Sequence, residues 1–286
     1  MVSRHTHFSG TRWVHLWLHL KDILKSSSEN EKSNTDQYSL NDLTAYRADM
    51  QRFFYHTSHN LKGPVTRLNG LIELLLMENA AGNNQQYLGK IDREVKQMKR
   101  MLAKLQTINE IAEYESKYQI CQLGEVISRV LARHQKNISE KNIFVRINTE
   151  EDYSLSYPDF LLFWTLDNLV ENAIVFSQSD PHIQSYLEIN IDKHDKQLLI
   201  SLEDNGDGIR QESIEHLFEL FYRDSPRSEG AGLGLYIVRE CIKKMGGEIR
   251  LESKPSKFTR FELVLPYLLS SDEAIRHKLT NTTYKV

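Results

Sequence analysis

A long apolar stripe before residue 76 is the feature that most constrains how this chain can fold. Apolar or small side chains recur there at alternating steps of four and three, the spacing of one face of an α-helix. They are Met50, Phe54, Thr57, Leu61, Pro64, Leu68, Leu71 and Leu75. Because a helix turns about 100° per residue, His59 lies roughly opposite this stripe. We therefore expect a long helix that packs along one face and presents His59 to solvent.

Pro64 stands five residues after His59, inside the same predicted helix. A proline at this place removes one backbone donor and crowds the carbonyl of Asn60, so the helix is expected to bend beside the histidine. A histidine that faces outward from a helix is usually a bystander. On a rigid, bent helix, however, it is also placed as an accessible nucleophile that could react with a bound partner.

A second apolar stripe follows a break at residues 80–84. Its members again alternate steps of three and four, and the other face of this helix is charged. They are Leu88, Ile91, Val95, Met98, Leu102 and Leu105. Two long helices with a short connection predict an antiparallel hairpin. Two such hairpins would cover both stripes in a four-helix bundle, which predicts a homodimer; the alternative is a monomeric hairpin packed on the next domain.

Composition limits the classes of protein that fit. The 286 residues suit two domains, and a net charge of -3 gives no general attraction to nucleic acid. Two distant cysteines without a CxxC motif fit a reducing compartment. The best candidate for a membrane span, 13–24, is too short and contains charged residues, so we expect no membrane-spanning segment and a cytoplasmic protein. This stretch is better explained as a short amphipathic helix, whose His15 and His19 lack a third metal ligand.

The pattern changes near residue 118 to shorter helices and strands. Helices are expected over 124–137, from Pro158 to Val170 and over 232–244, and strands over 143–147, 187–191, 198–202, 248–252 and 260–265. The predicted fold class is α+β: an antiparallel helical hairpin followed by an α/β two-layer sandwich. The expected domains are 1–38, a short helix and linker; 39–117, the hairpin; 118–268, the sandwich; and 269–286, a tail.

Two motifs in the second domain suggest a nucleotide site. Asn168 and Asn172 are four residues apart, so they share a helix face, and amide oxygens suit Mg²⁺ held together with phosphates. Asp204 follows a predicted strand and begins a turn with Gly206 and Gly208, which let the backbone pass close to a flat ligand. Alone, helical asparagines are often surface residues, and an Asp-Gly turn is often only a turn.

A third motif is rich in glycine and opens a helix. It consists of Gly230, Gly232, Leu233 and Gly234 with the alanine between the first two. Free backbone N–H groups at a helix N-terminus favour phosphate. The spacing matches neither a dinucleotide-binding fingerprint nor a GxxxxGK[ST] loop. Before it lie Phe221, a further candidate for the nucleotide site, and a short segment, 224–229, that could close over a nucleotide. Arg223 and Arg227 could contact its phosphates there.

Taken in order, these features resemble the sensor histidine kinases of two-component signalling. The resemblance spans about 43–266 and rests on the phosphoacceptor motif, the N box, the first glycine motif, the F box and the second glycine motif. These correspond to residues 58–64, 168–172, 204–208, 218–221 and 230–234. It implies a dimerising hairpin with His59 as phosphoacceptor and an ATP-binding domain of the Bergerat type. It also implies ATP with Mg²⁺, Asp204 on the adenine amine, Asn172 on Mg²⁺, and the receiver domain of a response regulator as partner.

Three positions depart from the family pattern. Asn60 stands where an acidic residue usually follows the histidine, so it can hydrogen-bond but cannot act as a base. Gly63 replaces the residue that positions water in the phosphatase reaction. Val175 replaces a basic residue, so neutralisation of the phosphates depends on Arg223 and Arg227.

Two alternative functions stay open. One is a pseudokinase that only binds ATP, and the other is a hydrolytic ATPase of the gyrase and chaperone type, although Asn168 replaces the glutamate base of those enzymes. With no sensor visible, input is expected from a separate protein or from a longer chain.

Overall fold

The computed structural model describes residues 34–77, 84–114, 119–150, 153–178, 180, 182–224 and 231–267. The predicted helix at 13–24 and the tail at 269–286 lie outside these residues. The chain divides into two compact units, Met1–Tyr55 and His56–Val286. None of the described helices combines the length and the apolar character that crossing a membrane requires.

The helical hairpin consists of α2 (Asn34–Met77) and α3 (Asn84–Glu113). The first helix begins before residue 39, where the hairpin domain was predicted to start, because its polar first turn carries no apolar periodicity that sequence analysis could detect. From Thr57 to Leu75 every member of the predicted stripe is half-buried or buried, whereas Phe54 is 56% exposed. The stripe is therefore confirmed from Thr57 onward.

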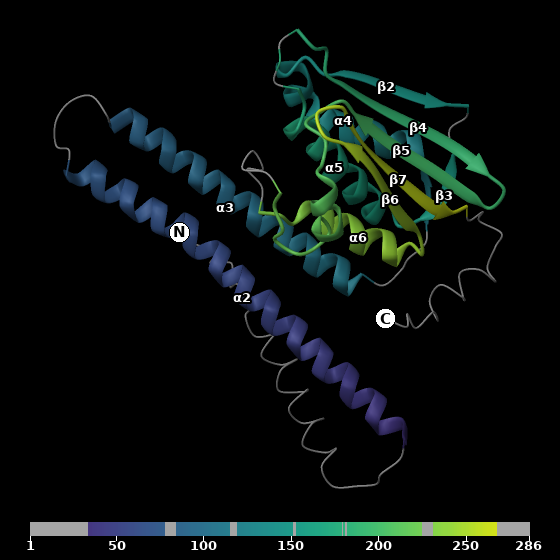
Figure 1. Cartoon of the computed structure of the whole chain (residues 1–286), viewed down its shortest axis with the longest axis horizontal. Coiled ribbons are helices and arrows are strands. Elements are labelled where there is room, and N and C mark those ends of the chain that lie inside the picture. The colour runs from purple at the N-terminus through teal and green to yellow at the C-terminus, as the bar shows by residue number, and fades with distance from the viewer. Residues whose placement is uncertain are drawn as a thin grey trace, which may run out of the picture. The chain divides into compact units, whose positions relative to one another are not determined.

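The second part is a two-layer sandwich, as predicted. Its five-stranded sheet has the order β2-β4-β5-β7-β6, with only the β2–β4 pair parallel. The strands are β2 (Phe144–Thr149), β4 (Tyr186–His194), β5 (Gln197–Asp204), β6 (Glu248–Lys254) and β7 (Phe258–Pro266). Three helices lie on one side of this sheet (Figure 1), namely α4 (Leu123–Glu140), α5 (Asp159–Val175) and α6 (Gly234–Lys244).

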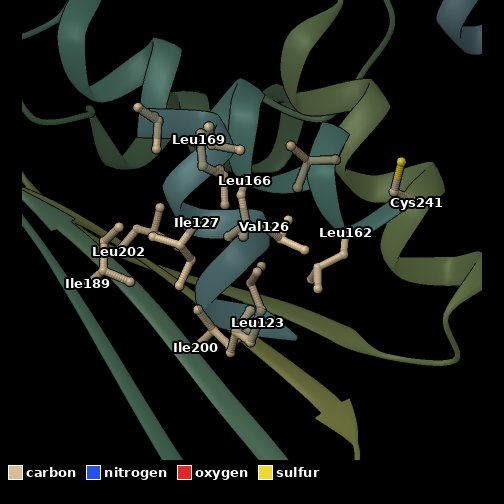
Figure 2. Close-up of a cluster of buried hydrophobic side chains, with 14 of the residues drawn as sticks. Leu123, Val126, Ile127, Leu162, Leu166, Leu169, Ile189, Ile200, Leu202 and Cys241 are labelled. Atoms are coloured by element: carbon tan, nitrogen blue, oxygen red, sulfur yellow. The ribbon is translucent and has the colours of Figure 1, made fainter. Parts of the chain in front are cut away.

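The core lies between this helical layer and one face of the sheet. Side chains alternate between buried and partly exposed along β5, which is the period of a half-buried strand. Figure 2 shows where the layers meet: Val126 of α4, Leu166 of α5 and Ile200 of β5 point into one cluster. All three are almost fully buried. This face fixes the register of the sheet, because a shift by one residue would expose the whole apolar set.

The strands predicted over 187–191 and 198–202 are present as β4 and β5, which form a hairpin. Its two-residue turn is Asp195–Lys196, with Asp195 at φ 51°. Sequence analysis missed the small sheet of β1 (Gln119–Gln122) and β3 (Ser154–Tyr157), and the 3₁₀ helix η1 (Gln211–His216). The two short strands pair across more than thirty residues, so no local turn signal marks them.

The end of α3 joins the core of the sandwich. Ile111 is 2% exposed and belongs to the same cluster of buried side chains. Lys244, in the last turn of α6, donates to the carbonyl oxygens of Ala112 and Tyr114 at 3.0 Å each. A lysine that binds free carbonyls at a helix end also opposes the negative end of the helix dipole. Helix α3 is thus tied to α6, which carries the second glycine motif at its start.

Candidate functional site

A cavity of about 500 Å³ is lined by residues of α5, β5, β7 and the start of α6. It has the size of a small-molecule site. Seven residues predicted to contact a nucleotide line it: Asn172, Asp204, Gly208, Arg223, Gly232, Leu233 and Gly234. Two further candidates, Arg227 and Gly230, lie outside the described residues. The structure therefore brings together residues that are up to 62 positions apart in the sequence.

Asp204 ends strand β5 and is 8% exposed. The pKa of its carboxyl is raised to about 7, mainly by burial; the backbone N–H of Gly206 opposes the rise, and the nearby Glu203 and Asp207 add to it. That N–H donates to Asp204 Oδ1 at 2.9 Å. A buried carboxyl with this strongly shifted pKa in the wall of a cavity is typical of a functional site.

The two glycines after Asp204 are required by close backbone approach. A Cβ on Gly206 would lie 2.3 Å from the carbonyl oxygen of Phe176, and one on Gly208 would lie 2.2 Å from that of Lys254. Gly208 also has a φ of 66°, which side chains other than glycine rarely adopt. Gly208 lines the cavity, whereas Gly206 is buried outside its lining. We conclude that Gly206 shapes the turn that carries Asp204.

The two asparagines of α5 differ in their exposure to the cavity. Asn172 lines the cavity, but Asn168 is 1% exposed and lies outside its lining. The Asn168 Nδ2 donates to the carbonyl of Trp164 at 2.8 Å, and its Oδ1 has no hydrogen-bond partner among the described residues. This Oδ1 lies 3.1 Å from the position that a Cβ would take on Gly234. Asn168 therefore leaves an unsatisfied acceptor at the start of α6.

Phe221 supports the second glycine motif from behind and does not line the cavity. Its backbone N–H donates to the carbonyl of Gly232 at 2.9 Å, and it has a φ of 67°. A Cβ on Gly232 would lie 2.6 Å from the Phe221 carbonyl carbon. The ring of Phe221 lies 6.1 Å from the ring of His56, which is three residues before His59 on α2.

His59 is exposed on α2, as predicted, and Asn60 beside it is half-buried. Neither residue lines the cavity. Pro64 is buried within the continuous helix. The bend beside His59 stays a prediction. The outward face of α2 thus offers an accessible imidazole, separate from the residues that form the cavity.

Sequence analysis missed several residues of the cavity wall. Thr259 and Phe261 come from β7, and the register of the sheet pairs Thr259 with Asp204. Lys104 comes from α3, where its spacing marked it only as part of the charged face, and Glu171 lies between the two asparagines. The Lys104 Nζ lies 2.5 Å from Glu171 Oε2. No local motif marks such residues, because the pairing of elements far apart in sequence brings them to the site.

Comparison with known families assigns a class to each of the two parts. Residues 49–113 match the family described as His Kinase A (phospho-acceptor) domain. Residues 159–269 match the family described as histidine kinase-, DNA gyrase B- and HSP90-like ATPase. The sandwich is therefore an ATP-binding domain, and the hairpin that carries His59 is a phospho-acceptor domain.

Curated relatives are similar to this chain over most of its length. The chain is 30% identical over 237 residues to the sensor-like histidine kinase SenX3 of Mycobacterium tuberculosis, covering 80% of this chain and 57% of that protein. It is 27% identical to the sensor histidine kinase WalK of Bacillus subtilis, and 26% identical to the methanogenesis regulatory histidine kinase FilI of Methanothrix harundinacea. These matches cover 77% and 80% of this chain but only 37% and 26% of those relatives. The chain belongs to the sensor histidine kinase family and spans about a quarter to three fifths of these relatives' length.

Solved structures support the same fold. The histidine kinase AdeS of Acinetobacter baumannii matches with a TM-score of 0.60 at 19% identity, over 74% of this chain and 98% of that one. The histidine kinase ThkA, in complex with the response regulator protein TrrA, matches with a TM-score of 0.63 at 18% identity, over 84% of this chain and 68% of that one. The predicted order of hairpin and sandwich is thus confirmed.

Proposed function

We propose that this chain is an ATP-dependent, autophosphorylating protein histidine kinase. It binds ATP in the cavity, transfers the γ-phosphoryl group to His59, and passes it to an aspartate in the receiver domain of a response regulator. The observation that carries this proposal is the pairing, in one chain, of an exposed histidine on a phospho-acceptor hairpin with an ATPase-type cavity that contains Asp204.

The cavity suits ATP in two regions. At one end the buried carboxyl of Asp204 is an acceptor for the exocyclic amine of adenine, and Thr259 and Phe261 provide a further wall. At the other end Gly232, Leu233 and Gly234 present backbone at the start of α6, where N–H groups favour phosphate. In our proposal Arg223 and Arg227 contact the phosphates.

The residues at the phosphate end also fit Mg²⁺. Asn172 offers an amide oxygen in the cavity, and Asn168 has an unsatisfied Oδ1 nearby. Within the described ranges, no three histidine, cysteine, aspartate or glutamate side chains gather into a metal site. That fits Mg²⁺, which is usually held by a few protein oxygens together with substrate phosphates. Bound in this way, Mg²⁺ would neutralise charge on the phosphates.

The chain's own contribution to the reaction is a positioned nucleophile. A ring nitrogen of His59 attacks the γ-phosphorus in line, so an N–P bond forms while the bond to the β-phosphate oxygen breaks and ADP leaves. Asn60 can accept a hydrogen bond from the other ring nitrogen, but it cannot remove the proton. Most of the rate then comes from positioning and from charge stabilisation.

Phosphoryl transfer fits this site better than hydrolysis. A hydrolytic ATPase needs a base to activate water. In this chain Asn168, a buried amide, takes the place of the glutamate that serves as this base in the gyrase and chaperone type. Glu171 is the acidic residue of α5 that lines the cavity, but its Oε2 lies 2.5 Å from the Lys104 Nζ. A carboxylate oxygen that accepts a hydrogen bond from an ammonium group has fewer lone pairs with which to take a proton from water.

We also propose that the protein acts as a homodimer. Several large apolar side chains of the hairpin are exposed in the single chain, including Leu76 at 69%, Met77 at 78% and Leu102 at 49%. Pairing with a second hairpin would bury part of this surface. Signals would reach this dimer from a separate sensor protein or from a further part of a longer chain.

The test is to incubate the protein with ATP labelled at the γ-phosphate and Mg²⁺, and to measure both bound label and released phosphate. The proposal predicts that His59→Gln abolishes labelling while ATP binding is retained, and that the matched variant His56→Gln, on the same helix, still carries label. Free phosphate released at an unchanged rate by His59→Gln would instead indicate an ATPase. ATP binding without any label in the wild type would indicate a pseudokinase.

A further inference from the structure

The side chain of Lys104 reaches the nucleotide cavity from the hairpin. Its Nζ lies 2.5 Å from Glu171 Oε2 and 3.5 Å from the position that a Cβ would take on Gly234. Only 21% of the Lys104 side chain is exposed. In contrast, Lys99 on the same helix is exposed and lines no part of the cavity. Lys104 is therefore directed into the site, at the first residue of α6.

The groups around Lys104 favour the binding of an anionic ligand. The start of α6 carries the positive end of the helix dipole, and the ammonium group faces the same space. Asn168 Oδ1, buried and without a hydrogen-bond partner among the described residues, lies at the same glycine. The ammonium group and the helix N-terminus both favour an anion, and the Glu171 carboxylate is the anion that Lys104 binds in this structure.

The other charges of the cavity wall increase the importance of this lysine. Four acidic residues line it, against three cations. The acids are Glu171, Asp204, Asp207 and Asp224, and the cations are Lys104, Arg210 and Arg223. Arg210 is bound to Asp224 at 2.7 Å, and Val175, at the end of α5, contributes no charge. The polyanionic end of a nucleotide therefore needs a cation beside α6, and Lys104 stands there.

We propose that Lys104 is a phosphate-binding residue of the nucleotide site. When a nucleoside triphosphate enters, the ammonium group exchanges the Glu171 carboxylate for oxygens of the terminal phosphates. This inference rests on the proposed function, since it concerns the nucleotide bound in that cavity. Because Lys104 belongs to α3, recognition of the phosphate chain is shared between the hairpin and the sandwich.

Calorimetric titration with ATP, ADP and AMP in the presence of Mg²⁺ tests this proposal. A charge-assisted hydrogen bond to phosphate is lost in Lys104→Gln, so we expect this variant to bind ATP about tenfold more weakly. AMP has no β- or γ-phosphate, so its affinity should change by less than about twofold. Lys104→Arg should restore most of the ATP affinity, and the matched surface variant Lys99→Gln should bind all three nucleotides like the wild type.

Glu171→Gln separates phosphate binding from a purely structural ion pair. If Glu171 only competes for the ammonium group, this variant binds ATP as tightly as the wild type or more tightly. The proposal is wrong if Lys104→Gln retains full ATP affinity, if it loses ATP and AMP equally, or if Glu171→Gln weakens ATP binding as much as Lys104→Gln does. A wild type that binds no ATP overturns the proposed function itself, so the two failures can be told apart. Thermal unfolding of each variant shows whether it is folded. If Lys104→Gln is not folded, the ATP and AMP affinities of Lys104→Arg and Glu171→Gln still test the proposal.

Discussion

The Oδ1 atom of Asp204 accepts a 2.9 Å hydrogen bond from the backbone N–H of Gly206 in the wall of the cavity. This bond stabilises the charged carboxylate, while burial stabilises its protonated form, and burial dominates, so that the pKa of Asp204 is raised to about 7. The charge at the adenine end of the proposed site therefore changes close to neutral pH.

The raised pKa predicts that Asp204 makes stability depend on pH. In the unfolded chain this carboxyl has its ordinary pKa of 3.8, so between that value and about 7 the folded protein binds more protons than the unfolded chain does. The contribution of Asp204 to stability is thus present at low pH and is lost as pH rises through this window, by at most about 4 kcal/mol. Urea denaturation at several pH values, for the wild type and Asp204→Asn, measures the difference. A difference that stays constant between pH 4 and pH 8 would contradict the assignment.

The same carboxyl predicts how nucleotide binding depends on pH. An amine of adenine binds an ionised carboxylate more strongly than a protonated one. ATP affinity should therefore rise with pH, and at pH 6 it should be lower than at pH 8 by up to about tenfold. The wild type and Asp204→Asn are both titrated with ATP at these pH values. Ionisation of the phosphates affects both proteins alike, so the difference between them reports the carboxyl of Asp204. An identical pH dependence in Asp204→Asn would show that Asp204 does not contact the base.

Gly208 should tolerate no side chain. Gly208→Ala places a Cβ 2.2 Å from the carbonyl oxygen of Lys254, at a φ of 66°, so the backbone must move. We expect a loss of stability of about 2 kcal/mol or more, together with weaker ATP binding. The matched control is Gly89→Ala on α3, where nothing lies within 4 Å of the added Cβ. This change should stabilise the helix by about 0.5 to 1 kcal/mol, and equal effects of the two substitutions on the midpoint of chemical unfolding would refute the steric argument.

Much of this architecture could be predicted from local patterns. The stripe from Thr57 to Leu75, the strands around the turn at Asp195 and the helix that starts at Gly234 each follow from periodicity or turn chemistry, and all are present. Asp204 was marked by its position between a strand and two glycines. These signals are readable because a few neighbouring residues determine them.

The residues that were missed depend on contacts between distant segments. The sequence shows Asn168 and Asn172 on one helix face, but only packing against α6 reveals that Asn168 is buried while Asn172 lines the cavity. Lys104 has the spacing of a solvent-exposed residue, and the docking of α3 on the sandwich turns it into part of the site. Periodicity describes which face of an element is apolar, but not which element covers the other face.

An ion pair joins the two helices of the hairpin. Arg67 binds Glu94 through two parallel bonds of 2.8 and 2.9 Å, and the Arg67 side chain is 52% exposed. A double-mutant cycle to alanine should give a coupling energy of about 0.5 to 1 kcal/mol that decreases at high salt. The exposed pair of Lys96 with Asp92 on α3 provides the control, with an expected coupling of about 0.3 kcal/mol. If the coupling energy between Arg67 and Glu94 is no larger than in this control, the two parallel hydrogen bonds contribute no additional stability.

The measurement that tests the central claim most directly is the chemical identity of the phosphorylated product. Wild-type protein is labelled from γ-labelled ATP, the product is exposed to acid and to base, and the labelled peptide is mapped. Our account predicts a label that acid removes and base does not, as for a phosphorus–nitrogen bond, located on the peptide that contains His59. A label that survives acid, or one that maps to any other peptide, would contradict it.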